Sequence, residues 1–343
     1  MKYLVAIWLI CRISESLRYR DHKLVYEMIQ ARKRPNCVRD SDYWFELASF
    51  LAVWSEILIL ITLYNNFDYY VVGAVVAIFV GGRFRALQEI GHTAIHMGFG
   101  RNKYIQYKMA DVLGNYLIFK SDSNRRFISH CVEHHPNANT DSDPNVPRLR
   151  SVGLSHGISM RKFLHIVFHS FSFKGIIETA SIMWSAFFGG GKIQAAERLI
   201  VNILVVSLVY YLGGVGGVFI YTISLVFIYP LFSWWSLLAE HRWFIDYDAG
   251  NSKSVHDSVV TQRTLYAPVA GYFVRMLVSP LTDSYHLLHH KYPRLHWKYS
   301  KIADRSLSEV DGTYSSNYSY GLFYSGSRQR SAIGDLYNRL VQK

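Results

Sequence analysis

Nine of the fifteen histidines in this chain are gathered in three short clusters and one isolated site. The first cluster is His92 and His96, the second is His130, His134 and His135, the third is His286, His289 and His290, and the isolated residue is His241. Neutral imidazole is a good ligand for mid-series metals such as iron, zinc and copper. Nine imidazoles are more than one ion with four to six ligands can use. The clusters therefore predict a site for two metal ions.

The spacing inside each cluster suits one face of a helix. His92 and His96 stand four residues apart, as do His130 and His134, and His135 would lie about 100° further round the helix. The third cluster follows the i, i+3, i+4 pattern. One such pair could arise by chance in a histidine-rich chain, but three clusters in one chain favour metal ligation over packing.

Ligand chemistry narrows the choice of metal without fixing it. Zinc sites close with four ligands, often including cysteine, and this chain has only Cys11, Cys37 and Cys131. Soluble di-iron bundles depend on bridging carboxylates, whereas the conspicuous ligands here are histidines. Copper remains open on ligand type alone. The odd cysteine count, without paired spacing, predicts no disulfide framework and suits a reducing compartment.

Long apolar runs flank the histidine clusters. Half of the residues are hydrophobic and 18% are charged, compared with roughly 25% charged in soluble proteins. No Lys or Arg occurs between Arg39 and Arg83, or between Arg198 and Arg242, and each gap is 43 residues long. A helix of that length reaches roughly 65 Å, about two crossings of a hydrocarbon core. Each run therefore predicts a helical hairpin.

The expected fold is an all-α integral membrane protein with four transmembrane helices in two hairpins. A cytosolic helical cap is expected to hold the histidine site. The turns are predicted at 64–68 and 213–217, and the spans at about 44–63, 68–88, 199–212 and 216–237. A basic segment, 1–43, precedes this membrane domain of 44–300, and a polar tail, 301–343, follows it. The tail is rich in Tyr, Ser and Gly and is expected to be loosely ordered.

All 37 Lys and Arg residues lie outside the two predicted hairpins. The positive-inside rule then puts 1–39, 83–198 and 242–343 in the cytosol, with both termini and every histidine cluster. We expect a multi-pass protein of a bacterial inner membrane or the endoplasmic reticulum. The net charge of +12 would face anionic lipid. No basic patch with interleaved aromatic residues predicts nucleic-acid binding.

Two further apolar segments need a separate interpretation. A fifth span within 161–190 would put the second and third clusters on opposite sides of the bilayer, so we predict one or two helices lying in the interface. The N-terminal run Tyr3–Cys11 is like a signal-peptide core but has no clear cleavage site. We expect it to form an interfacial or packed helix, with a retained anchor as the alternative.

The three clusters, their order and their place after each hairpin resemble the membrane-bound fatty acid desaturase and hydroxylase superfamily. Its pattern of His-x3-4-His, His-x2-3-His-His and His-x2-3-His-His is met in full, and Asp143-Pro144 and the segment 239–242 are also similar. The similarity covers about 45–300. It implies four spans, a cytosolic centre of two iron ions, and O2-dependent oxidation of unactivated C–H bonds.

The resemblance also implies which residues hold the metal. The implied iron ligands are His92, His96, His130, His134, His135, His241, His286, His289 and His290. Glu89, Glu133 and Glu240 are candidate partners of the ligating rings, since such histidines usually donate their other N–H to a carboxylate or carbonyl. Asp143 is a candidate for holding the loop of the second cluster, or forms a simple Asp-Pro turn.

The expected reaction is desaturation of an acyl chain in a lipid or acyl thioester. A hydroxylase of the same superfamily is the close alternative, and a metal transporter is a distant one. Electrons would come from a separate ferredoxin, rubredoxin or b-type haem carrier, because three scattered cysteines cannot hold a typical iron–sulfur cluster. Lys120, Arg125 and Arg126 are expected to meet anionic membrane lipids, or alternatively a phosphate-bearing head group.

Other polar residues in apolar surroundings are not expected to bind metal. His165 and His169 stand four apart inside the predicted interfacial segment, and His296 follows the third cluster. All three are interpreted as bystanders. Glu56 and Asn202 lie within predicted spans, where polar groups are costly, so they should face a partner helix or a polar substrate group.

Overall fold

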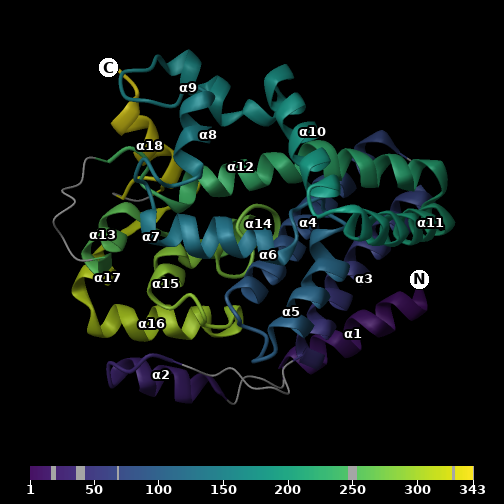
Figure 1. Ribbon diagram of the computed structural model, residues 1–343, viewed down its shortest axis with the longest axis horizontal. Coiled ribbons are helices and arrows are strands. Elements are labelled where there is room, and N and C mark those ends of the chain that lie inside the picture. The colour runs from purple at the N-terminus through teal and green to yellow at the C-terminus, as the bar shows by residue number, and fades with distance from the viewer. Residues whose placement is uncertain (17–20, 36–42, 68, 246–252, 327–328, 343) are drawn as a thin grey trace. The chain divides into compact units, whose positions relative to one another are not determined.

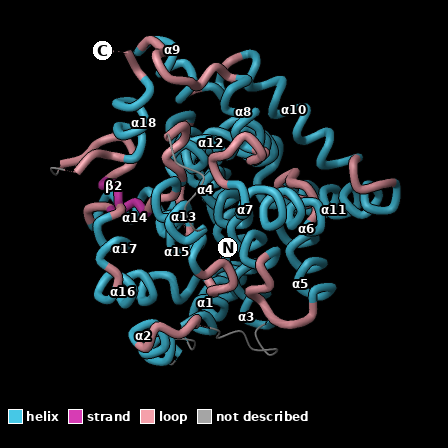
Figure 2. Tube along the Cα trace, turned by 60° about the vertical axis from the view of Figure 1, so that its left-hand side comes forward, coloured by secondary structure: helices cyan, strands magenta, loops and turns pink. Residues whose placement is uncertain are grey.

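The structure is a computed structural model of the chain. It describes residues 1–343 apart from 17–20, 36–42, 68, 246–252, 327–328 and 343. Two residues discussed above lie outside the described residues. They are Cys37, and Asp68 at the end of the first predicted turn. The chain divides into two compact units. Helices dominate both, with two short strands among the described residues (Figures 1 and 2).

The first unit comprises Met1–Arg20, Val38–Arg126 and Phe173–Phe232. Its elements are α1 Lys2–Ser16, α3 Tyr43–Phe67, α4 Tyr70–Ile95, α5 Lys103–Ala110, the π-helical turn η3 Asp111–Asn115, α6 Ser123–Arg126, α10 Phe173–Phe188, α11 Lys192–Ile223, the π-helical turn η6 Ser224–Ile228 and the start of α12 Tyr229–Glu240.

Helices α3 and α4 carry the first apolar run. Their apolar windows have mean hydropathies of 2.0 and 1.6, and each helix is long enough to cross a membrane. They confirm the predicted helices at 44–63 and 68–88, although α4 continues to Ile95. Gly81 of α4 lies so close to η6 that a Cβ there would be 2.5 Å from the Ile228 Cγ2. The sequence thus uses glycine where two helices make their closest approach.

The third candidate span runs from Lys192 to Glu240 through α11, η6 and α12. Its 49 residues would reach about 74 Å if straight, more than twice the hydrocarbon core. At Gly214 the backbone leaves the helix, with φ 60° and ψ −158°. A Cβ on Gly217 would lie 3.4 Å from the Val209 carbonyl oxygen, whereas eight residues of straight helix span about 12 Å. The chain therefore folds back at Gly214, which confirms the turn predicted at 213–217.

Helix α1 packs on α3 around a partly buried carboxylate. Glu56 accepts hydrogen bonds from Trp8 Nε1 at 2.9 Å and Arg12 Nη2 at 2.5 Å, and its other oxygen pairs with Arg83 Nη1 at 3.0 Å. A charge in an apolar helix requires such partners. Asn202 donates to the backbone carbonyl of Tyr116 at 3.2 Å. Both polar residues face partner segments of their own unit, as predicted.

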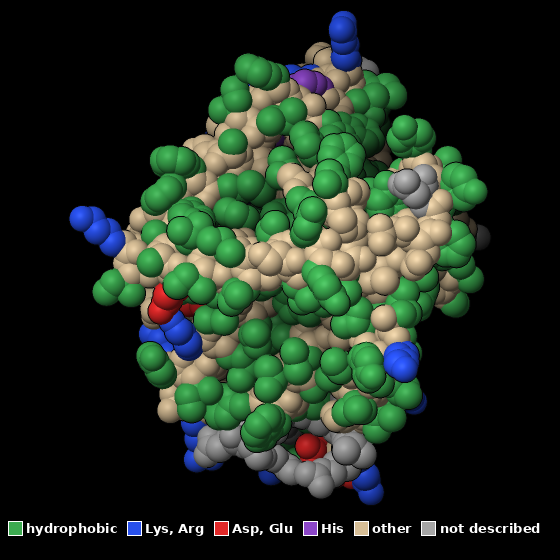
Figure 3. All heavy atoms as spheres, turned by 90° about the vertical axis from the view of Figure 1, so that its right-hand side faces the viewer, with side chains coloured by type: hydrophobic (Ala, Val, Ile, Leu, Met, Phe, Trp, Pro, Cys, Tyr) green, Lys and Arg blue, Asp and Glu red, His purple; other side chains and the backbone are tan. Residues whose placement is uncertain are grey.

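The predicted interfacial segment 161–190 forms separate helices in the two units, α9 Met160–Val167 in the second and α10 in the first. Helix α10 has 16 residues, fewer than the roughly 20 needed to cross a bilayer, and is not a candidate span among the described residues. Its interfacial position stays a prediction. Helix α11 exposes large apolar side chains, among them Leu204 and Tyr211. Figure 3 shows the side of Figure 1 on which α11 is drawn, and hydrophobic side chains predominate on it.

The second unit comprises Asp21–Cys37, Phe127–Ser172 and Ser233–Lys343. Its elements are α2 His22–Gln30, the π-helical turn η4 Phe127–His134, α7 His135–Asn137, α8 Asn145–Ser151, α9, the 3-10 turn η5 His169–Phe171, the end of α12, α13 Lys253–Val260, β1 Arg263–Leu265, α14 Pro268–Leu277, the 3-10 turn η7 Asp283–Tyr285, α15 His286–Lys291, the 3-10 turn η8 Trp297–Tyr299, α16 Ser300–Val310, α17 Gly312–Ser316, β2 Tyr318–Tyr320 and α18 Ala332–Leu340.

The described residues of the C-terminal tail form helices and a strand, so the expectation of a loosely ordered tail is wrong for them. Helix α16 contributes Leu307 to a core that also contains Val25 of α2 and Leu288 of α15. Strand β2 pairs in parallel with β1, with Arg263 opposite Tyr318, so the described fold is not entirely helical. Although the tail is polar in composition, it has apolar side chains at helical spacing, such as Leu336 of α18, and these are buried in a core.

Candidate metal centre

The second unit by itself brings together seven of the nine histidines. They come from three places in the chain: the second cluster on η4 and the start of α7, His241 just after α12, and the third cluster on α15. More than 100 residues separate the second cluster from the other two places. The seven rings form a group of four and a group of three, described in turn below.

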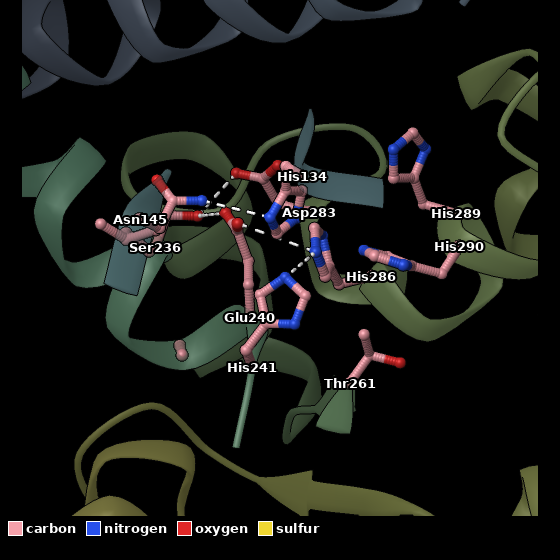
Figure 4. A network of polar contacts seen from close by, with 12 residues as sticks. His134, Asn145, Ser236, Glu240, His241, Thr261, Asp283, His286, His289 and His290 are labelled. Atoms are coloured by element: carbon pink, nitrogen blue, oxygen red, sulfur yellow. Dashed lines mark hydrogen bonds and ion pairs between the residues drawn. The ribbon is translucent and has the colours of Figure 1, made fainter. Parts of the chain in front are cut away.

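The four-histidine group is fully buried. His134, His241, His286 and His290 each offer one ring nitrogen, and these nitrogens all lie within 4.8 Å of one another. The shortest approach is 2.9 Å, between the Nε2 atoms of His286 and His241. Figure 4 shows these four rings converging from three separate segments. Four nitrogens at these separations are suited to bind one metal ion with imidazole ligands.

The three-histidine group is a triangle of Nε2 atoms. His135 lies 3.1 Å from His130 and 3.2 Å from His289, and His130 lies 3.5 Å from His289. His130 and His134 thus belong to different groups, although their rings stack at 5.2 Å, as expected for neighbours on one helix face. In the π-helical η4, hydrogen bonds join residues five apart, and His130 and His135 also stand five apart. Their Nε2 atoms therefore lie close together, whereas His134 belongs to the four-histidine group.

The protonation states of the buried rings suit metal binding. Burial, followed by the neighbouring imidazoles of His286 and His134, holds the pKa of His241 well below its ordinary value. Burial and the nearby His135 and His286 do the same to the pKa of His290. Neutral rings keep a lone pair for a metal. Within the described residues, neither ring nitrogen of His290 has a hydrogen-bond partner, an arrangement that a bound cation would satisfy.

Asp143 orients His134 from the outer side of its ring. Both carboxylate oxygens lie 3.0 Å from the Nδ1 of His134, and the backbone N–H groups of Asn139 and Asn145 donate to the same carboxylate at 2.8 and 2.9 Å. A carboxylate is only an acceptor, so Nδ1 carries the hydrogen and Nε2 keeps its lone pair. This geometry supports the predicted role of Asp143 in holding the loop of the second cluster.

A second such carboxylate was not found by sequence reasoning. Asp257 of α13 is buried, and its Oδ1 lies 3.6 Å from the Nδ1 of His290. It faces the outer side of that ring, as Asp143 does for His134. Its position in the sequence follows no spacing rule relative to the histidine clusters, so only the folding of α13 onto α15 reveals it. The one available signal was an acidic residue between His241 and the third cluster.

Glu240 occupies a different position from the other carboxylates. Its Oε2 lies 3.9 Å from the Nε2 of His286, the nitrogen that faces the interior of the four-histidine group. Its Oε1 accepts a hydrogen bond from Ser236 at 2.8 Å, and the same hydroxyl lies 2.8 Å from Asp283. Figure 4 shows this chain of contacts beside the histidines. The side chain of Glu133 is exposed, which gives no support to its predicted role.

The first unit holds the first histidine cluster at the C-terminal end of α4. The Nε2 atoms of His92 and His96 lie 3.3 Å apart. Glu89, one turn earlier, lies 2.9 Å from the Nδ1 of His92 and pairs with Arg85 at 3.2 Å. The predicted partner role of Glu89 thus has the geometry that leaves the Nε2 of His92 as a lone-pair donor.

The predicted bystander histidines lie outside these groups. His165 is exposed, and the ring of His169 lies against Trp234 at 5.5 Å. His296 is buried and its Nδ1 accepts the backbone N–H of Lys298 at 3.2 Å, which caps η8. All three are thus accounted for by ordinary surface or packing positions.

The basic residues before the second cluster are engaged within the first unit. Arg125 binds Asp122 at 2.5 Å, and Arg126 donates to the side-chain oxygen of Asn115 at 2.6 Å. These contacts give no support to the alternative that the two guanidinium groups hold a phosphate-bearing head group. Lys120 lies 5.7 Å from the centre of the Tyr229 ring.

Comparison with known protein families gives one match. The family described as fatty acid desaturase matches residues 69–321. That range covers well over half of the chain and includes all nine histidines of the clusters. No match to a curated protein was found.

Proposed function

Because the chain belongs to the fatty acid desaturase family, we propose that it is a membrane desaturase that removes two hydrogens from an acyl chain at a di-iron centre, with O2 as co-substrate. The observation that carries this proposal is the division of seven histidines, six of them buried, into a group of four and a group of three. Two neighbouring groups of imidazole ligands are suited to two metal ions rather than one.

The ligand sets follow from the same groups. His134, His241, His286 and His290 would hold one iron. His130, His135 and His289 would hold the other. His92 and His96 of the first unit stay proposed iron ligands. Iron held this way would supply the reductive activation of O2 that is needed to oxidise an unactivated C–H bond. Side chains alone cannot perform this chemistry.

The residues around the ligands would keep the site in a binding-ready state. Asp143 and Asp257 face the outer nitrogens of His134 and His290 and would fix ring orientation before any metal arrives. Burial of the four-histidine group excludes water, which protects an oxidising centre from side reactions.

We further propose four membrane crossings with the histidines on the cytosolic side. The support is the pair of helices α3 and α4, and the reversal at Gly214 that divides the 49-residue span into lengths of about 33 and 39 Å, each enough for one crossing. All Lys and Arg residues fall outside the apolar runs. Labelling sealed vesicles from each side near His130 and near His289 tests this topology: opposite accessibility would contradict it.

The electrons for O2 reduction would come from a partner protein. The described cysteines Cys11 and Cys131 are single and far apart in sequence, so they offer no iron–sulfur site. The excess of basic residues over acidic ones suits an acidic ferredoxin, rubredoxin or b-type haem carrier. Which of these donates is decided by reconstitution with each carrier in turn.

The proposal is tested by metal analysis and lipid mass spectrometry on the expressed protein. We expect near two irons per chain, and acyl products that have lost two hydrogens. Products that gain one oxygen would instead identify a hydroxylase of the same family, and metal moving across vesicles without lipid oxidation would indicate a transporter. His134→Ala and His289→Ala should each abolish the product, whereas His165→Ala, as the matched control, should not.

A further inference from the structure

Helix α14 of the second unit presents its apolar stripe outward. Val269, Tyr272, Phe273 and Met276 follow the i, i+3, i+4, i+7 spacing of one helix face. The first three are exposed by 73%, 59% and 47%, and Met276 is partly buried. In a soluble helix, a stripe with this spacing faces the core. In α14 most of the stripe is exposed instead.

The face of α14 that turns toward its own unit is small. Gly271 is buried, and a Cβ at that position would lie 2.8 Å from the Cβ of Tyr266. Glycine thus lets the helix sit close against the preceding segment. Three bulky apolar side chains, Val269, Tyr272 and Phe273, are left exposed to whatever surrounds the unit.

The charge and length of α14 suit a helix that lies along a membrane surface. Its ten residues contain one charged side chain, Arg275, near the C-terminal end. A long arginine can keep its guanidinium at the lipid head groups while its stem lies in apolar surroundings. Ten helical residues extend about 15 Å, half of a hydrocarbon core, so α14 cannot cross it.

A lipid surface is within reach because the second unit contains the end of a candidate span. The apolar helix Lys192–Glu240 finishes in this unit, which includes Ser233–Glu240. Next to that end, Trp235 contacts Phe323 at 4.8 Å and Phe168 at 5.9 Å, and both phenylalanines are about half exposed. Exposed aromatic side chains near the end of a span are typical of the membrane–water interface.

We propose that α14 is a membrane-docking helix, with Val269, Tyr272 and Phe273 inserted at the boundary between lipid head groups and acyl chains. Such a helix buries its apolar face roughly 5–10 Å into that boundary. A segment of eight residues, 278–285, joins α14 to α15, which carries the third histidine cluster. Docking of α14 would therefore restrict how far these histidines can move from the bilayer surface.

The test uses the full-length protein in phosphatidylcholine nanodiscs with a photo-cross-linking residue, benzoylphenylalanine, in place of Phe273. The matched control carries it in place of Arg305 of α16, an exposed position of the same unit whose side chain pairs with Glu309. After irradiation, mass spectrometry measures phospholipid adducts on the chain. We expect about tenfold more lipid adduct at position 273 than at position 305.

Two outcomes would overturn the proposal. Equal lipid adducts at both positions would mean that α14 has no special contact with lipid. Protein adducts at position 273, either to a second copy or within the chain, would mean that another protein surface covers the stripe. The circular dichroism spectrum of each variant reports whether the helical fold survives the substitution. The readout needs no catalysis, so it stands or falls separately from the proposed reaction.

Discussion

Replacing Asp143 with asparagine should weaken one iron and spare the other. Asp143 is completely buried and faces the Nδ1 of His134 with both oxygens at 3.0 Å. The asparagine side chain would still fill the space and could accept one hydrogen bond, but it would lose the charge that favours an Nδ1–H donor. It could also present its amide N–H to the ring and favour the tautomer that carries its hydrogen on Nε2.

The size of the effect follows from the interaction removed. A hydrogen bond to a charged group contributes about 1.5–3 kcal/mol when buried, and loss of a carboxylate behind a ligating histidine typically costs roughly 10–100-fold in metal affinity. At about 1.4 kcal/mol per tenfold change, the two ranges overlap at about 1.5–3 kcal/mol. We therefore expect the iron of the four-histidine group to bind roughly 10–100-fold more weakly.

The assay is competition between the purified protein and an iron chelator, followed as iron release over a range of chelator concentrations. Asp143→Asn should give two phases, with one iron released at a lower chelator concentration and the other as in the unmodified protein. Glu133→Gln is the matched control, because Glu133 precedes His134 in η4 but its side chain is exposed. Unchanged release from Asp143→Asn, or equal loss in the control, would refute the reasoning.

Three further changes test other parts of the structure. Glu240→Gln keeps the shape of the side chain but removes the charge facing His286 Nε2, so iron affinity measured by chelator competition should fall on the order of tenfold. An unchanged affinity would exclude Glu240 from the metal environment. Gly214→Ala forces an L-residue into φ 60°, ψ −158° and should lower the unfolding free energy by about 1–3 kcal/mol, whereas Gly312→Ala, a glycine with open space around it, should change it little. Leu336→Ala opens a cavity at a side chain that is 1% exposed and should cost about 2–5 kcal/mol in thermal unfolding; no loss would mean that the tail contributes nothing to the core.

The positions of the apolar helices were predictable because hydropathy is a local property. The absence of Lys and Arg over two 43-residue runs predicted α3, α4 and the long helix that ends at Glu240. The glycine-rich segment 213–217 predicted the reversal, and the positive φ found at Gly214 is one that glycine adopts readily. By contrast, the tail is mostly polar, and only a few of its residues are apolar at helical spacing. Its helices were therefore not predicted.

Which histidines form the candidate metal centre could largely be predicted from the sequence, because imidazoles at i, i+3 and i+4 form a recognisable pattern on any helix. How these histidines divide into two groups is visible only in the tertiary structure. A π-helical turn, which spacing does not reveal, places the Nε2 of His130 beside that of His135, while His134 joins the four-histidine group. His241 joins His286 only because α12 ends beside α15. Asp257 reaches His290 by the same kind of long-range packing. Residue type and spacing fix what a side chain can do chemically, whereas its partners depend on contacts between segments far apart in the chain.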